Sequence, residues 1–345
     1  MGNNRTPDRP NAFSPIAQSR RLEVAVHGLV AVYRKELEDH FSSTRFILLL
    51  TVILMVSLVT SYMVGSGLRS ELEGFAKPSL VFLLLFTSTG ALFSLVQFIA
   101  FFGPLIGMIL GFDAINRERA AGTLSKVLSQ PIYRDAVING KFLAGLTVIA
   151  LMLVAIVLLI SGMGLWVLGV VPGWEEVGRL AVYLVVSIVY IGFWLVISIL
   201  CSVLFRSMAT SALAGLALWI FLAFFMALGA RLVADVISPI PPGASSDPTA
   251  EVQHERTREI VASLSPITLY SQATGTMLDP MRKTTRSLIL MGPMERLSLS
   301  RFQNPLPLLQ SALIVAPHLV SLVATTVICF AICYACFMRQ EIRST

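Results

Sequence analysis

Charged side chains are scarce in this sequence. Asp, Glu, Lys and Arg make up 13% of its 345 residues, about half of their usual share in soluble domains. Hydrophobic residues make up 55%. A soluble domain of this length needs a charged surface, which this composition does not provide. The apolar residues stand in long blocks, which excludes a disordered or collagen-like chain and predicts a polytopic membrane protein.

Cysteines and N-terminal signals are equally limited. Cys201 stands in one apolar block, and the other three cysteines stand together in another, so they do not form the disulfide framework of a small secreted protein. The C-x-x-C from Cys333 to Cys336 has no second pair, which favours simple packing over metal or redox use. We expect no metal site. The first 45 residues contain no apolar segment typical of a cleaved signal peptide.

Six apolar blocks are long enough to cross a bilayer, which takes about 20 helical residues. The block 80–112 is awkward, because one helix of that length would extend about 50 Å, whereas two spans and a turn would not fit. We expect one span at 90–113, preceded by a helical stretch at the outer surface. The predicted spans cover residues 46–64, 90–113, 142–170, 180–205, 209–230 and 306–338.

The placement of lysine and arginine predicts the orientation. With the N-terminus inside, most basic residues fall in inner segments, whereas the short outer loops hold only Arg69, Lys77 and Arg179. Both termini are then cytoplasmic, as in a multi-pass protein of the cytoplasmic membrane. The net charge of +6 reflects this bias rather than nucleic-acid binding. Segment 235–305, between spans five and six, is expected outside, where it either gates the exit, binds an extracytoplasmic partner or forms a solvated lid.

Polar segments flank the spans at both ends of the chain. Residues 1–21 are expected to form a disordered cytoplasmic tail, and residues 339–345 a second, shorter one. Residues 22–41 carry apolar side chains at helical spacing, which predicts an amphipathic helix in the membrane interface. A helix packed on protein is the alternative. The apolar stripe consists of Leu22, Val26, Leu29, Tyr33, Leu37 and Phe41.

The loop 114–141, which follows span two, is the most informative stretch. Charged residues end one helix, a glycine–threonine pair breaks it, and leucines then mark a short apolar face. A charged turn followed by an exposed apolar helix is typical of a docking element for a soluble partner. The alternative is a membrane-surface loop without a partner. The candidate docking residues are Glu118, Arg119, Gly122, Thr123, Leu124 and Leu128.

This loop resembles the cytoplasmic loop between spans two and three of ABC-2 type exporter permeases. The likeness is greatest to the branch associated with multicopper-enzyme maturation and gliding motility. It rests on the run E-x-x-x-G-T-L at 118–124, on Pro131-Ile132 followed by Arg134, and on Gly140-Lys141 at the start of span three. The six spans, the N-terminal interfacial helix and the closing residues 337–341 are also similar to that branch.

The resemblance implies an all-α permease subunit that pairs with a second permease chain, identical or homologous. Two copies of a cytoplasmic ABC ATPase would dock on the 114–141 loop, and ATP and Mg²⁺ would bind to the ATPase rather than to this chain. Closure of the ATPases would rock the permeases and export substrate. Residues 22–41 would be the elbow helix. The coupling residues would be Glu118, Arg119, Gly122, Thr123 and Leu124.

The sequence offers no catalytic site of its own. A P-loop requires G-x-x-x-x-G-K-[ST], but Asp135 replaces its first glycine and Phe142 its last residue. The spans contain almost no ionisable residues, which disfavours an intramembrane enzyme or a proton-coupled transporter. Gln97, the main polar residue of span two, is a candidate for the translocation path. A membrane scaffold that recruits a soluble complex without transport is the alternative to an exporter.

Overall fold

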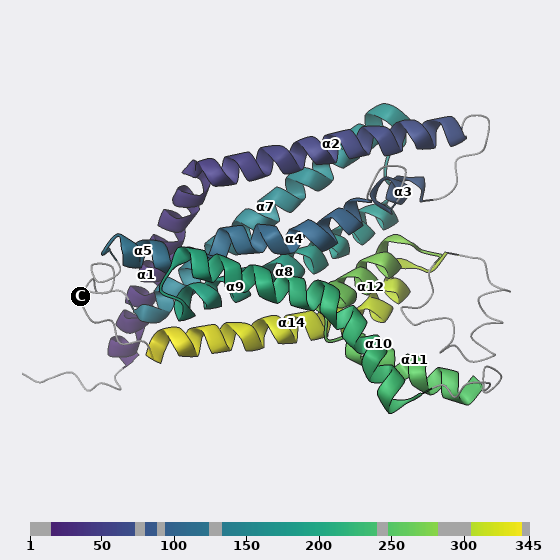
Figure 1. Cartoon of the computed structure of the whole chain (residues 1–345). Helices are drawn as coiled ribbons and strands as arrows, with labels where there is room; N and C mark the ends of the chain where they lie inside the picture. The colour runs from purple at the N-terminus through teal and green to yellow at the C-terminus, as the bar shows by residue number, and fades with distance from the viewer. Residues whose placement is uncertain are drawn as a thin grey trace, which may run out of the picture.

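The chain folds as a bundle of long α-helices. The structure, a computed structural model, describes residues 15–72, 80–87, 94–123, 133–239, 248–281 and 305–339, and these contain helices and no β-strand. The long helices run side by side, while α1 (Pro15–Ser42) crosses one end of the bundle (Figure 1). α1 begins inside the segment 1–21, which was expected to be a tail. The predicted all-α architecture is confirmed.

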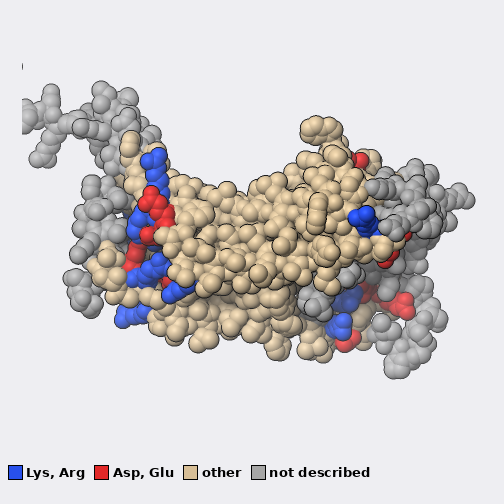
Figure 2. All heavy atoms as spheres, turned by 90° about the horizontal axis from the view of Figure 1, so that it is seen from above, with Lys and Arg blue, Asp and Glu red and all other residues tan. Residues whose placement is uncertain are grey.

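Within the described residues, six helices are long and apolar enough to cross a membrane, which confirms the predicted number of spans. Charged side chains gather at the two ends of the molecule, and the face between them consists of other residues (Figure 2). Lipid around the middle of the bundle requires this distribution. The helices are α2 (Thr44–Leu72), α4 (Leu95–Gly111), α7 (Arg134–Leu168), α8 (Trp174–Leu204), α9 (Met208–Ile220) continued by η1 (Phe221–Phe225), and α14 (Leu308–Arg339).

The awkward block 80–112 forms one span with a short helix before it, as predicted. The short helix, α3 (Val81–Thr87), is largely buried. α4 then starts with a capping box, in which the Ser94 hydroxyl accepts a hydrogen bond from the Gln97 N–H and the Gln97 Oε1 accepts one from the Ser94 N–H. Gln97 therefore lies in the first turn of α4 with its side chain exposed. Its role in a translocation path stays a prediction.

α8 is the central helix, since it packs against α4, α7, α12 and α14. α4 approaches it closely because Gly103, Gly107 and Gly111 lie one turn apart. A Cβ on Gly107 would lie 2.6 Å from the backbone oxygen of Ile191, and a Cβ on Gly111 would lie 2.9 Å from that of Leu195. Small residues at a spacing of four are typical of tight helix pairs in membranes.

Pro104 lies inside α4 and cannot donate a backbone hydrogen bond to the carbonyl of Ala100. The Tyr190 hydroxyl of α8 donates to that carbonyl oxygen instead, at 2.7 Å. Farther along, the Ser198 hydroxyl donates to the carbonyl of Met108 at 2.8 Å. An unpaired carbonyl inside a membrane is costly, so the Tyr190 hydroxyl replaces the donor that Pro104 lacks. The Met108 carbonyl already accepts from the Phe112 N–H at 3.0 Å, and Ser198 adds a second donor that ties α8 to α4.

Between spans five and six, the described residues form three helices: α10 (Met226–Ile237), α11 (Pro248–Ala262) and α12 (Pro266–Leu278). α10 and α11 pair with each other and project from the end of the bundle opposite α1 (Figure 1). α12 differs, because it packs against α8, α14 and α4 and buries Leu269, Tyr270 and Ala273. Part of the segment expected to be extracytoplasmic is therefore built into the bundle.

A buried arginine holds α12 in place. The side chain of Arg179, on α8, is fully buried. Its guanidinium donates to the carbonyl oxygens of Met277, at 2.9 Å, and of Leu306, and to the Ser311 hydroxyl at 3.2 Å. Glu175 supplies the counter-charge at 2.9 Å. Arg179 thereby joins α8 to the end of α12 and the beginning of α14.

Candidate coupling site

The predicted docking loop begins with a short helix, α5 (Asn116–Ala120), at the same end of the bundle as α1 (Figure 1). The helix ends in a Schellman motif. Gly122, with φ of +64°, donates its N–H to the carbonyl of Arg119 at 3.1 Å, and Thr123 donates its N–H to that of Glu118 at 3.0 Å. Glycine adopts this left-handed φ without strain. The glycine–threonine pair therefore ends the helix, as its position predicts.

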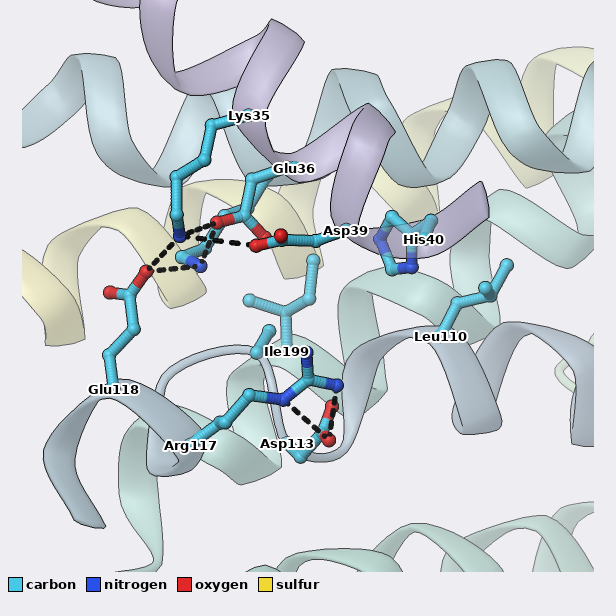
Figure 3. A pocket seen from close by; sticks show the side chains of 11 residues that line it. Lys35, Glu36, Asp39, His40, Leu110, Asp113, Arg117, Glu118 and Ile199 are labelled. Carbon is cyan, nitrogen blue, oxygen red and sulfur yellow. Dashed lines mark hydrogen bonds and ion pairs between the residues drawn. The ribbon is translucent and has the colours of Figure 1, made fainter. Parts of the chain in front are cut away.

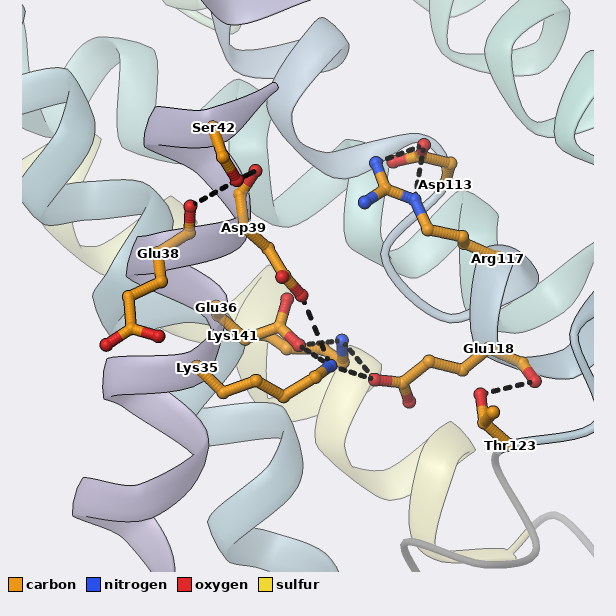
Figure 4. A network of polar contacts seen from close by, with 10 residues as sticks. All are labelled: Lys35, Glu36, Glu38, Asp39, Ser42, Asp113, Arg117, Glu118, Thr123 and Lys141. Atoms are coloured by element: carbon orange, nitrogen blue, oxygen red, sulfur yellow. Dashed lines mark hydrogen bonds and ion pairs between the residues drawn. The ribbon is translucent and has the colours of Figure 1, made fainter.

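The side chain of Glu118 points into the protein and joins three other charged residues, Lys35, Glu36 and Lys141 (Figures 3 and 4). We refer to these four residues as the charge quartet. The Lys141 Nζ lies 3.0 Å from Glu118 Oε1 and 2.7 Å from Glu36 Oε1. The Lys35 Nζ lies 3.1 Å and 3.0 Å from the same two oxygens. Two ammonium groups and two carboxylates thus alternate and connect α1, α5 and α7.

The charge quartet is buried except for Lys35, whose side chain is half exposed. Burial alone would raise the pKa of the Glu36 carboxyl, but Lys141 and Lys35 outweigh it and lower that pKa. For Lys35, burial works in the opposite direction, and the two carboxylates outweigh it and raise its pKa. Glu36 and Lys35 therefore both stay charged at neutral pH and hold α1 against the loop.

Gly140, the residue before Lys141, brings α7 against α1. A Cβ at this position would lie 2.8 Å from the Val32 Cγ1 and 3.3 Å from the backbone nitrogen of Tyr33. Any larger residue would separate the two helices. Gly140 thus allows α7 to approach α1 closely, and Lys141 then places its ammonium group next to Glu36.

A second cluster lies at the end of α4, where Asp113 binds two arginines. The Asp113 carboxylate accepts from Arg117 at 2.8 Å and from Arg45, at the beginning of α2, at 3.2 Å. Both clusters line one cavity of about 30 Å³ (Figure 3), which has room for about two water molecules. His40 lines it too, and burial lowers the pKa of its imidazole.

Arg119 faces away from the charge quartet. Its guanidinium donates to the Asn116 side chain and to the Phe205 carbonyl, both at 3.3 Å. The Ser202 hydroxyl accepts from the backbone N–H of Asn116 at 3.2 Å. α5 is therefore fastened to the turn between α8 and α9 as well. Leu124 and Leu128 lie outside the described residues, so the predicted apolar face stays a prediction.

Metal-binding side chains are not clustered here. In the described parts of the chain, no group of three or more His, Cys, Asp or Glu side chains is placed to hold a metal ion. Glu118 Oε1 is paired with both lysines of the charge quartet, while its Oε2 is buried without a hydrogen-bond partner among the described residues. The ion pairs of the charge quartet connect the loop to α1 and α7.

Six spans, and a polar loop fastened by ion pairs to one end of them, are the features of a multi-pass membrane permease. Residues 30–342 match the family described as ABC-2 family transporter protein, and the chain belongs to this family. It is also 30% identical over 146 residues to the "Probable ABC transporter permease protein NosY" of Stutzerimonas stutzeri. That match covers 40% of this chain and 48% of the relative, so it spans about half of the relative's length.

Family membership and the six apolar helices establish the coarse function. The chain is a permease subunit of an ABC transporter, a multi-pass protein of the cytoplasmic membrane. Membership of an ABC transporter family implies an ATPase partner.

Proposed function

We propose that this permease exports its substrate and is driven by a separate ATPase that docks on the 114–141 loop. The charge quartet carries the proposal. Glu118 belongs to the loop, and its carboxylate is held by Lys141 of α7 and Lys35 of α1. A displacement of the loop by a docked ATPase would therefore move span three and α1 together with it.

The strength of this connection follows from burial. Removing one partner of a buried ion pair costs about 3–5 kcal/mol, because the other charge is left uncompensated. Glu118 and Lys141 are both buried, so the loop resists separation from α7. The Schellman motif at Gly122 ends α5 after Ala120.

The remaining assignments belong to the same proposal. Two ATPase copies bind ATP and Mg²⁺, and a second permease chain, identical or homologous, completes the translocation path. α1 lies in the membrane interface as the elbow helix, and both termini are cytoplasmic. Segment 235–305 then lies on the opposite side, where α10 and α11 are available to an extracytoplasmic partner. The alternative is a scaffold that binds a soluble complex without transport.

Two substitutions test the docking assignment. Glu118→Lys reverses the charge of the carboxylate in the charge quartet, and Gly122→Pro imposes a φ near −65° where the chain has +64°. Both should release the co-purifying ATPase, or abolish the stimulation of its ATP hydrolysis by the permease, while leaving membrane insertion intact. Glu38→Lys is the matched control, because Glu38 is an exposed carboxylate of α1 outside the charge quartet.

Each result has a defined meaning. If both variants keep the ATPase bound and stimulated, the docking assignment is wrong. If the unaltered permease binds an ATPase without changing its rate of ATP hydrolysis in proteoliposomes, the scaffold is favoured over the exporter. Loss of ATPase binding in Glu38→Lys as well would mean that the whole face, rather than Glu118, is required.

A further inference from the structure

Residues of α2 and α7 line a groove. It lies near the C-terminal ends of these two helices, which are at the end of the bundle opposite α1 (the helices are seen in Figure 1). Its volume is about 390 Å³, which is within the range of small-molecule sites, ~300–1,000 Å³. Four of its residues lie along the C-terminal part of α2, and two lie near the end of α7. The lining residues are Tyr62, Ser66, Arg69, Ser70, Trp166 and Val167.

Several polar side chains of the groove can donate hydrogen bonds to a ligand. Arg69 is exposed, and its guanidinium makes no ion pair or hydrogen bond within the part of the chain that the structure describes. The same holds for the Tyr62 hydroxyl. Ser66 and Ser70 donate to carbonyls of their own helix, at 3.0 Å and 2.8 Å. A serine hydroxyl rotates readily, so both are free to donate to a ligand instead.

The aromatic residues indicate the depth at which the groove lies. Tyr62 and Trp166 are 53% and 75% exposed, and tyrosine and tryptophan prefer the level of the lipid head groups. Toward the middle of the bundle, the same two helices expose apolar side chains, among them Val59 of α2 and Leu158 of α7. The two helices that line the groove therefore also present apolar surface to the acyl region of a bilayer.

We propose that this groove binds the phosphate-bearing head group of a membrane phospholipid. The Arg69 guanidinium pairs with the phosphate, for which its planar donors are well suited. The hydroxyls of Tyr62, Ser66 and Ser70 donate to the remaining phosphate or glycerol oxygens. The acyl chains lie over Val59 and Leu158, which a free phosphate would not use. A lipid bound in this way bridges α2 and α7, and the site is independent of the direction of transport.

Lipid binding to the full chain in detergent tests the proposal by native mass spectrometry. The probes are dioleoyl phosphatidylglycerol, dioleoylglycerol and inorganic phosphate. Phosphatidylglycerol should bind as a 1:1 adduct in preference to dioleoylglycerol, and Arg69→Gln should weaken it about tenfold or more, as expected for a charged hydrogen-bond donor. Arg231→Gln is the matched control, since Arg231 is an exposed arginine of α10, and its affinity should not change.

Three outcomes would overturn the proposal. Unchanged phosphatidylglycerol binding by Arg69→Gln would show that the guanidinium does not contribute to lipid binding. Equal binding of dioleoylglycerol would show that the surface binds acyl chains without recognising the phosphate head group. Displacement of the lipid by inorganic phosphate at equal concentration would assign the groove to free phosphate. Because Arg69 and Arg231 are both exposed, neither variant is expected to prevent folding.

Discussion

Glu118 and Lys141 are 23 residues apart in the chain and form a buried ion pair, with 3.0 Å between Oε1 and Nζ. They are the first residue of the run E-x-x-x-G-T-L and the second residue of the pair Gly140-Lys141. The E-x-x-x-G-T-L run and the Gly140-Lys141 pair, which lie at opposite ends of the loop motif, are therefore joined by a direct ion pair. Gly122 supplies the left-handed turn, and Gly140 the close approach to α1. Each of these residue types has a physical reason to occupy its position.

Lys141→Met should be strongly destabilising. Methionine keeps most of the length of the lysine side chain without its charge, and it leaves Glu36 and Glu118 with Lys35 as their sole cation in the charge quartet. The expected loss is about 3–5 kcal/mol, the range for one partner of a buried pair. The free energy of unfolding, measured by denaturant titration in detergent micelles, checks this value.

A double substitution separates lost attraction from general damage. In Lys141→Met with Glu118→Gln, no carboxylate of α5 is left uncompensated, so part of the stability should return. The two single effects should then add up to more than the double effect. Strictly additive effects would contradict a direct Glu118–Lys141 interaction.

His40 should make stability fall as the medium is acidified. Burial lowers the pKa of its imidazole below the usual 6.5, against the attraction of Glu36 and Asp113 and with the repulsion of Lys141 and Arg117. Below pH 6.5 the His40 imidazole therefore binds a proton in the unfolded chain but remains neutral in the folded chain until the pH reaches its lower folded-state pKa. The stabilisation is present above pH 6.5 and is lost as the pH falls toward the folded-state pKa.

The measurement is the thermal unfolding midpoint of the detergent-solubilised protein between pH 7.5 and 5. His40→Asn should reduce the decrease that the unaltered protein shows on acidification. His27→Asn is the control, because His27 is an exposed residue of the same helix. Glu36 does not interfere, since its pKa is lowered from 4.5 and its contribution persists until the pH falls below that value. Identical pH profiles for His40→Asn and the unaltered protein would contradict the prediction.

Gly107→Ala should separate α4 from α8. The added Cβ would lie 2.6 Å from the backbone oxygen of Ile191 and 2.8 Å from the backbone nitrogen of Leu195, and backbone atoms do not move aside easily. Overpacking of this kind costs about 1–3 kcal/mol. Gly67→Ala, in α2, has nothing within 4 Å of the new Cβ and should stabilise by up to about 1 kcal/mol. Equal effects of the two substitutions on unfolding free energy would exclude a tight α4–α8 contact.

The sequence predicts the spans because membrane insertion depends on long apolar runs, which are local features. The helix end at Gly122 is also local, since a glycine followed by threonine suits a Schellman motif. The partners of Glu118 are not local: Lys35 lies 83 residues away, and only the packing of α1 across the bundle brings it near. For Lys141 the sequence contained one indication of an ion pair. A cation at the start of an apolar span is expected to have an anion nearby.

Two further features differ in how far the sequence alone could predict them. α12 contains Thr, Ser and Gln among its apolar residues, so its sequence resembles that of a solvated helix, and its burial depends on α8 and α14. The close α4–α8 contact was within reach of the sequence, because glycines at 103, 107 and 111 have the spacing of four that is typical of tight membrane pairs.

Tyr190→Phe should destabilise by about 1–3 kcal/mol, because the Ala100 carbonyl would lose its donor in a buried place. The cause of that requirement is Pro104, which has no N–H to offer. In a Pro104→Ala background, the alanine N–H can bond the Ala100 carbonyl through the regular helix, so the same Tyr190→Phe change should cost much less. The free energies of unfolding of the two single variants and the double variant measure this coupling. An equal cost in both backgrounds would show that the hydroxyl stabilises α8 in another way, and that the proline in α4 does not depend on it.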